Sequence, residues 1–257
     1  MPRSAFFVLV VLTVCLMGCG PRPSAAAAGH AKREGPDASY VAPPAVTGAS
    51  LNGGRVALNG TAQAGSRVRL AAPNGAASLV TADAAGRWRL SLSAASEPRL
   101  FGLSLTSGAR TVQGQGYLLL TPGGEGVLLR SGAGALRLGA RAKPGLTAFD
   151  FDRQGGAVVS GTAAPGSSVT LRGGHGRAAD GRADSAGRFA VALAEPLGPG
   201  LQRITVIGDF GQDSAVIDAT PAAPLAEGPI RSVRTAAGLR VDWMTPGGGV
   251  QSTLITD

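Results

Sequence analysis

An internal duplication is the strongest constraint that this sequence places on its fold. Two segments of the first half recur in the second half: NGTAQAGSRVRL (59–70) as SGTAAPGSSVTL (160–171), and ADAAGRWRLSL (82–92) as ADSAGRFAVAL (183–193). Both pairs keep a spacing of 101 positions, from Gly60 and Gly161 through Trp88 and Phe189, without a gap. Self-similarity at a fixed period is the signature of a repeated structural unit. The sequence therefore predicts two copies of one module, with a boundary near Pro144.

Within each copy, apolar residues alternate with polar ones. Val68 and Leu70 alternate with arginines in the first copy, and Val169 and Leu171 hold the same positions in the second. A period of two residues is typical of strands with one buried face. Turn signals rich in Gly, Asn and Asp separate these runs, and no stretch beyond the N-terminal region shows a helical stripe. Many short strands and about 100 residues per unit predict an antiparallel β-sandwich in each copy.

The segment that follows each sandwich is less regular. Residues 125–138 and 227–241 read as extra strands, and residues 239–243 and 250–255 read as a final hairpin around a glycine-rich turn. About 30 residues cannot bury a core alone. We therefore expect these segments to pack onto the two modules rather than to form a third domain.

The repeated pattern resembles a known group of domains. G-T-A-x-x-G-S-x-V-x-L followed by A-D-x-x-G-R-[WF]-x-[LV]-x-L is similar to the bacterial immunoglobulin-like domains found in tandem on envelope and surface proteins, over residues 54–112 and 155–218. The resemblance implies an all-β fold with two tandem immunoglobulin-like sandwiches. It says little about activity, because this sandwich hosts many unrelated functions.

The N-terminal residues predict export and anchoring. A basic start precedes an apolar run at 6–16 that is too short to span a membrane. The following LMGC at 16–19 resembles the lipobox of bacterial lipoproteins, which implies that residues 1–18 are a signal peptide and that Cys19 carries lipid. An ordinary secretory signal is the alternative. Gly20, rather than Asp, after the cysteine implies an outer-membrane location, facing the periplasm or the cell surface.

The remaining domain plan follows from composition. Residues after the lipobox are rich in Ala and Pro and lack apolar periodicity, which is typical of a flexible tether. Cys15 leaves with the signal and Cys19 carries lipid, so the folded part has no thiol for a disulfide, a zinc cluster or a nucleophile. The expected parts are the signal peptide (1–18), the lipidated tether (19–45), a basic first module (46–143) and a second module with the C-terminal hairpin (144–257).

Charge is distributed unevenly between the modules. The chain has a formal net charge of +8, and residues 46–143 carry eleven basic and three acidic groups, whereas residues 144–257 carry nine and eleven. Outward-facing arginines on two strands of the first module would attract phosphate or carboxylate groups of lipopolysaccharide, peptidoglycan or an acidic protein. The alternative is that they are simply solvated strand positions. Nucleic acid is not expected, because an exported protein rarely meets it and the arginines are not interleaved with aromatic residues that could serve as stacking platforms. The candidate anion-binding residues are Arg67, Arg69, Arg87 and Arg89.

Catalytic and metal-binding patterns are hard to find. His30 lies in the tether and His175 in a glycine-rich loop, and neither belongs to a catalytic motif. Two aspartate pairs fit turn chemistry better than a Ca²⁺ site: Asp150 with Asp152, and Asp180 with Asp184. We therefore expect no enzymatic activity, no cofactor and no metal.

The aromatic residues fall into two groups. Trp88 and Phe189 hold the same place in the two copies, which predicts that both lie in a core. Trp243 has no aromatic counterpart and precedes the glycine-rich turn of the final hairpin. It is either another core residue or an exposed contact for a partner, and we take it as a candidate partner contact.

Three functions remain open on the sequence. The first is a non-enzymatic, lipid-anchored envelope protein that acts as a structural or interaction module. The second is binding of envelope glycan or lipopolysaccharide through the basic first module. The third is an accessory subunit of an envelope enzyme or secretion complex.

Overall fold

The computed structural model describes residues 40–139, 143–173 and 178–257, and this part of the chain is all-β, with nineteen strands. Residues Val41–Asp257 form one compact unit. The all-β expectation is confirmed. The expected signal peptide and the tether up to residue 39 lie outside the described residues. The residues there that the sequence singled out are Cys15, Cys19, Gly20 and His30, and His175 is also outside.

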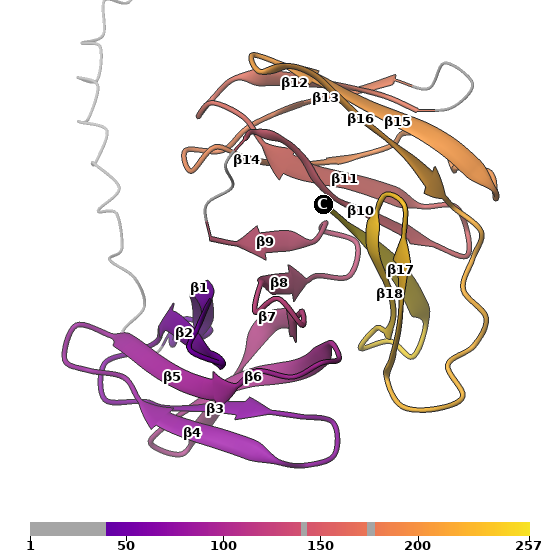
Figure 1. Cartoon of the computed structure of the whole chain (residues 1–257). Helices are drawn as coiled ribbons and strands as arrows, with labels where there is room; N and C mark the ends of the chain where they lie inside the picture. The colour runs from indigo at the N-terminus through magenta and orange to yellow at the C-terminus, as the bar shows by residue number, and fades with distance from the viewer. Residues whose placement is uncertain (1–39, 140–142, 174–177) are drawn as a thin grey trace, which may run out of the picture. The chain divides into compact units, whose positions relative to one another are not determined.

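The first module, defined here as β1–β9, contains two antiparallel sheets (Figure 1). Sheet A has the order β1-β2-β5, and sheet B has the order β4-β3-β6-β7-β8-β9. The strands are β1 (Ala45–Asn52), β2 (Arg55–Thr61), β3 (Arg67–Ala71), β4 (Ala77–Thr81), β5 (Arg87–Ser93), β6 (Arg99–Ser107), β7 (Arg110–Leu120), β8 (Gly126–Leu129) and β9 (Leu136–Leu138).

The second module, β10–β19, also contains two antiparallel sheets. Sheet C has the order β14-β11-β10-β19-β18-β17, and sheet D has the order β13-β12-β15-β16. The strands are β10 (Gly145–Asp152), β11 (Ala157–Thr162), β12 (Ser168–Arg172), β13 (Ala178–Arg182), β14 (Arg188–Ala192), β15 (Leu201–Gly208), β16 (Gly211–Asp218), β17 (Ile230–Thr235), β18 (Gly238–Met244) and β19 (Val250–Thr256).

The first seven strands of each module follow one topology. The first, second and fifth strands form one sheet, and the fourth, third, sixth and seventh strands follow one another in the other sheet. Two such antiparallel sheets packed face to face are an immunoglobulin-like sandwich. The duplicated sequence thus folds into two sandwiches of the same kind.

The repeated AD-x-x-GR segments form matching hairpin turns. In the first module, Oδ1 of Asp83 accepts hydrogen bonds from the amides of Ala85 (2.9 Å) and Arg87 (2.8 Å). Asp184 makes the same pair of bonds in the second module. Gly86 has a φ of 73°, a conformation that favours glycine. The local turn chemistry read from the sequence is therefore present in both copies.

Each sandwich has its own core between its two sheets. Trp88 (2 % exposed) lies in the first core and Phe189 (3 % exposed) in the second, which confirms the core role predicted for both. A Cβ at Gly60 would lie 2.1 Å from the Trp88 ring, and one at Gly161 would lie 2.3 Å from the Phe189 ring. A glycine beneath the ring is thus required in both copies.

The strands beyond the seventh extend different sheets in the two modules. β8 and β9 continue sheet B beyond β7, the seventh strand of the first module. β17–β19 continue sheet C beyond β10, the first strand of the second module, and β18 and β19 form the expected final hairpin. Within the described residues, neither segment forms a sheet of its own.

A third core, which we call the junction core, joins the two modules. The outward face of sheet B contributes Leu119, Val127 and Leu129. The outward face of sheet C contributes Val241 and Trp243. The four sheets therefore stack in the order A, B, C and D, with a hydrophobic core between each neighbouring pair.

Candidate interaction surfaces

The four arginines predicted to bind anions do not share one face. Arg67 and Arg69 lie on β3 of sheet B, whereas Arg87 and Arg89 lie on β5 of sheet A, and all four are exposed. The apolar residues that alternate with them point into the core between these two sheets. The two arginine pairs therefore point in opposite directions. Whether either pair binds anions stays a prediction.

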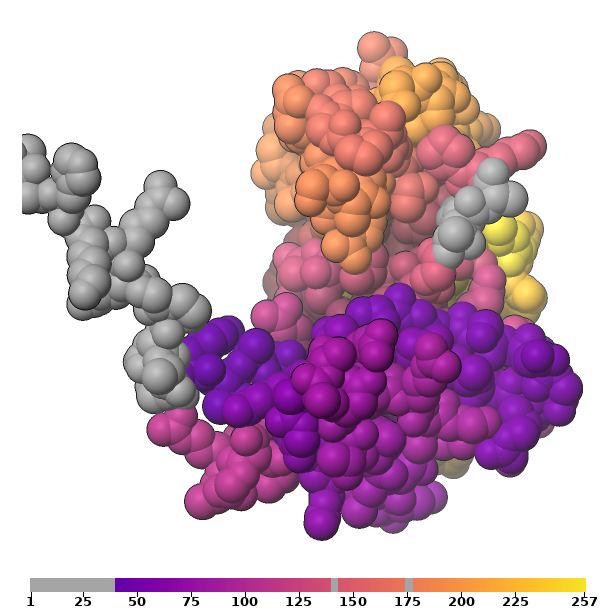
Figure 2. Space-filling model, turned by 90° about the vertical axis from the view of Figure 1, so that its left-hand side faces the viewer, coloured from indigo at the N-terminus to yellow at the C-terminus, as the bar shows by residue number. Residues whose placement is uncertain are grey.

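The outward face of sheet A gathers a third arginine that sequence reasoning missed. Arg55 on β2 is exposed, and its Nε donates to Oγ of Ser91 on β5 at 2.8 Å. On the same face, Arg87 pairs with Asp83 at 3.2 Å, and Arg89 lies opposite Asn59. Residues of these first strands, indigo to purple, form a large exposed surface in Figure 2. The alternation of polar and apolar residues from Arg55 onward could have predicted that this arginine points outward.

The outward face of sheet B is only partly open. At its β3–β4 end, Arg69 lies opposite Leu79, which is 55 % exposed. At its β7–β8 end, the same sheet is covered by the junction core. This face therefore offers one arginine pair beside an exposed apolar residue, on an edge strand.

The structure corrects the partner contact proposed for Trp243, which is fully buried (0 % exposed) in the junction core. Its indole Nε1 donates to Oγ1 of Thr253 at 3.0 Å, and its ring meets Tyr117 edge to face at 6.0 Å between centroids. The sequence did not reveal that strands of the first module would cover this face of sheet C. An external partner cannot reach this side chain in the folded unit.

A buried carboxylate lies in the same junction. Oδ2 of Asp150 accepts the amide of Ala135 at 2.6 Å, and Oδ1 accepts the Thr253 hydroxyl and the Gln251 amide. Burial is the main influence on this carboxyl and raises its pKa to about 6, although these hydrogen bonds and the charge of Arg130 act in the opposite direction. The junction thus contains one group that titrates near neutral pH.

The other aspartates of the two predicted pairs are engaged in local structure. Asp152 Oδ1 accepts the amides of Gln154 and Gly156, both at 2.9 Å, and Asp180 accepts the Thr170 hydroxyl at 2.7 Å. The residues that the structure describes hold no group of three or more His, Cys, Asp or Glu side chains able to bind a metal ion. In the same residues, no helix has the length and apolarity needed to cross a membrane.

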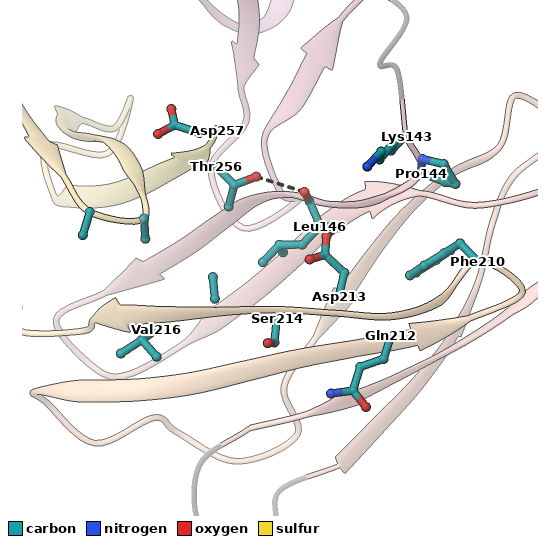
Figure 3. A pocket seen from close by; sticks show the side chains of 13 residues that line it. Lys143, Pro144, Leu146, Phe210, Gln212, Asp213, Ser214, Val216, Thr256 and Asp257 are labelled. Atoms are coloured by element: carbon teal, nitrogen blue, oxygen red, sulfur yellow. Dashed lines mark hydrogen bonds between the residues drawn. The ribbon is translucent and has the colours of Figure 1, made fainter.

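A groove of about 850 Å³ lies beside the edge strand β16 (Figure 3). One wall consists of five consecutive residues of β16, from Gln212 to Val216. The other wall includes Thr256 at the end of β19 and the turn between β17 and β18, and Leu146 of β10 lies between the walls. The Thr256 hydroxyl donates to the Leu146 carbonyl at 2.9 Å. A groove lined by successive residues of a strand follows its hydrogen-bonding edge, because alternate residues point to opposite faces.

Comparisons with solved structures return several alignments, all with low TM-scores. A biofilm-associated protein (BSP domain) aligns with 72 % of this chain at 16 % identity and a TM-score of 0.24. The chicken interferon gamma receptor alpha chain aligns with 71 % of this chain and 100 % of its own, at 13 % identity and a TM-score of 0.23. The central fibronectin-III array of RIM-binding protein aligns with 84 % of this chain and 89 % of its own, at 14 % identity and a TM-score of 0.25.

This chain spans less than a third of the biofilm protein, since the alignment covers 30 % of that chain. No family model matches the sequence, and no curated protein matches it. TM-scores this low leave the fold assignment to the order of the strands themselves.

Proposed function

We propose that this protein is a non-enzymatic lipoprotein of the bacterial outer membrane, anchored through Cys19, whose folded part is a structural and interaction module. The LMGC sequence at 16–19 supports the anchor, and the junction core carries the part of the proposal that concerns the folded module. Sheets B and C pack face to face through Trp243 and its neighbours, so the sandwiches form one compact unit rather than two independent domains. Such a unit on a lipidated tether suits a protein that presents surfaces to partners at a distance from the membrane.

The anchor is tested by a matched pair of cysteine variants. Cys19→Ser removes the lipid acceptor, whereas Cys15→Ser changes a residue that leaves with the signal peptide. We expect labelled palmitate in the wild type and in Cys15→Ser, both in the membrane fraction, and an unlabelled, released product from Cys19→Ser. A Cys19→Ser product that still carries label, or an unlabelled wild type, would contradict the anchor.

The interaction role is tested by affinity purification from solubilised envelopes with the anchor intact. We expect a partner that depends on the folded module and persists when His175 is replaced. A stoichiometric envelope enzyme among the partners would favour the accessory-subunit function. Hydrolytic activity of the purified chain itself would contradict the non-enzymatic assignment.

Anion binding by the first module is a second candidate, favoured by the face of sheet A. Three arginines share this face, and among the described residues only Arg87 of the three forms an ion pair, with Asp83. Arg55→Ser with Arg89→Ser should abolish salt-sensitive binding to purified peptidoglycan or lipopolysaccharide. Arg67→Ser with Arg69→Ser, on the opposite face, removes the same charge and serves as the control. An equal loss in both double variants would indicate a general charge effect and contradict a site on sheet A.

A further inference from the structure

The duplication provides an internal comparison for the groove beside β16. In the first module, β7 pairs on its outer edge with β8, through Tyr117 opposite Leu129 and Leu119 opposite Val127. The corresponding edge of the second module carries no strand in the described part of the chain, because sheet D ends at β16. One copy of the module thus holds a strand where the other has a groove.

The pairing registers identify the equivalent residues. Ala71 and Arg172 are 101 positions apart, and they pair with Gly102 and Thr205. Those two residues pair in turn with residues of β7 and β16: Gly102 with Tyr117, and Thr205 with Ser214. The four residues of β7 that pair with β8 therefore correspond to residues 214–217 of β16, and three of these line the groove.

The backbone of β16 is available along this edge. The hairpin closes at Gly208 opposite Gly211, and in an antiparallel ladder every second residue bonds to the neighbouring strand. The amides and carbonyls of Gln212, Ser214 and Val216 consequently point away from β15, toward the groove. The described residues give these groups no hydrogen-bond partner. The strand also lacks the Lys, Pro or bulge that commonly blocks an edge, and the charged Asp213 that lines the groove is held by the amide of Leu146.

The shape of the groove limits what can bind there. Sheet C continues for three strands beyond β10, whereas sheet D stops at β16. The wall formed by Thr256, Ala236 and Ala237 therefore lies across from the free edge. A second folded sheet, such as that of another copy, would meet this wall. A single extended segment is narrow enough to lie beside β16.

The charges in the groove favour a largely uncharged segment. Oδ2 of Asp213 accepts the amide of Leu146 at 2.9 Å, and Asp257 pairs with Arg234 at 2.6 Å. Lys143 forms no ion pair with the described residues and lies toward the end of the groove marked by Phe210 (Figure 3). An antiparallel segment would place its C-terminal end there, where an acidic group would be attracted to the ammonium.

We propose that this groove is a strand-acceptor site. It binds an extended, mostly apolar segment of a partner protein, antiparallel to β16, in the position that β8 occupies on β7, with an acidic group at its C-terminal end near Lys143. Main-chain hydrogen bonds supply the affinity in such a complex, and alternate side chains supply the specificity. This inference rests on the proposed interaction role and names its site and the chemistry of its partner.

The probe is a fluorescent peptide, GEGVLLE, which carries residues 124–129 of this chain followed by glutamate. Binding to the solubilised mature chain is measured by fluorescence anisotropy. Val216→Pro removes an N–H that points away from β15, so the β15 ladder stays complete. Val216→Thr keeps that N–H and is the control. We expect saturable binding that weakens roughly tenfold or more in Val216→Pro and changes little in Val216→Thr.

A second arm first modifies the peptide backbone and leaves the protein unchanged. Methylation of alternate peptide amides should abolish binding in one phase and leave it intact in the other, because only one phase faces β16. A third arm tests the charge. Lys143→Gln should weaken binding of the acidic peptide. It should not change binding of an analogue that has Gln in place of the final Glu and a C-terminal amide. Absence of saturable binding, or equal effects of the two methylation phases, would overturn the proposal. Failure here would leave the palmitate and fractionation results untouched, so the two proposals fail separately.

Discussion

The two modules share seven strands and then use the remaining chain differently. In the first module, the extra strands extend sheet B next to β7, the seventh strand. In the second module, they extend sheet C next to β10, the first strand. Both sets then meet in the junction core. A repeated sequence thus specifies the same sandwich twice, and the unrepeated segments decide which edge is covered and which edge is left open.

The same contrast holds at a single pair of equivalent positions. Ser50 of β1 lies opposite Ala57, and Asp150 of β10 lies opposite Val158, with Ala57 and Val158 101 positions apart. Ser50 is exposed on the outward face of sheet A, but Asp150 is buried because sheet B covers the outward face of sheet C. The surroundings of this position, and not its place in the module, decide whether a carboxyl group there would have a pKa near neutral pH.

The largest expected effect is the loss of unfolding free energy when a buried tryptophan is removed from the junction core or from the core of the first module. Trp243→Ala and Trp88→Ala should each lower the free energy of unfolding by about 3–5 kcal/mol, because each removes a fully buried indole. The chain has two tryptophans, so in each variant the fluorescence of the remaining tryptophan follows the unfolding of the other core. In urea, Trp243→Ala should show the modules unfolding in separate transitions by circular dichroism. A single cooperative transition in that variant would mean that the junction does not couple them.

The next effect is a pH dependence carried by the junction alone. The folded pKa of Asp150, about 6, exceeds the ordinary 3.8, so the folded state holds the proton more tightly. The stabilisation is complete below pH 3.8 and is lost as the pH rises through 6. A difference of about two pKa units corresponds to roughly 3 kcal/mol.

Asp150→Asn, which cannot ionise, should remove this loss when unfolding free energies are compared between pH 4 and pH 7. Ser50→Asp places a carboxyl at the equivalent exposed position and is the control, for which no added pH dependence is expected in this range. Parallel pH profiles for wild type and Asp150→Asn would show that Asp150 is not the responsible group.

A smaller effect should be the same in both modules. Gly60→Ala and Gly161→Ala each place a methyl group against an aromatic ring and a carbonyl oxygen, and overpacking of this kind destabilises by about 1–3 kcal/mol. Adding Phe189→Leu should relieve part of the loss in Gly161→Ala, as a double-mutant cycle of thermal unfolding would reveal. Strictly additive changes would exclude the ring as the source of the clash.

The smallest effect concerns the matching hairpin turns. The amide of Arg87 is the main cause of the lowered pKa of Asp83, and the amide of Arg188 does the same for Asp184. Asp83→Ala and Asp184→Ala should therefore lower the unfolding midpoint slightly and by similar amounts in calorimetry. A clearly larger loss in one variant would show that the two turns are not equivalent.

The sequence allowed the local structure to be predicted, but not the choice between sheets. Alternation distinguishes inward from outward residues, and the shared position of Trp88 and Phe189 in the two copies placed both in cores. Alternation does not show which sheet a strand joins, so it could not reveal that Arg67 and Arg87 point in opposite directions. Trp243 was misjudged for a related reason, because sheet C is covered on both faces and an outward position there is still buried.

The sharing of sheet C between two cores has a mechanical consequence. A pull applied to the two ends of the unit Val41–Asp257 is transmitted through the packed faces of sheets B and C. Separating the modules requires wetting Trp243 and the aliphatic side chains around it in one step. The folded part should therefore behave under tension as a short stiff strut.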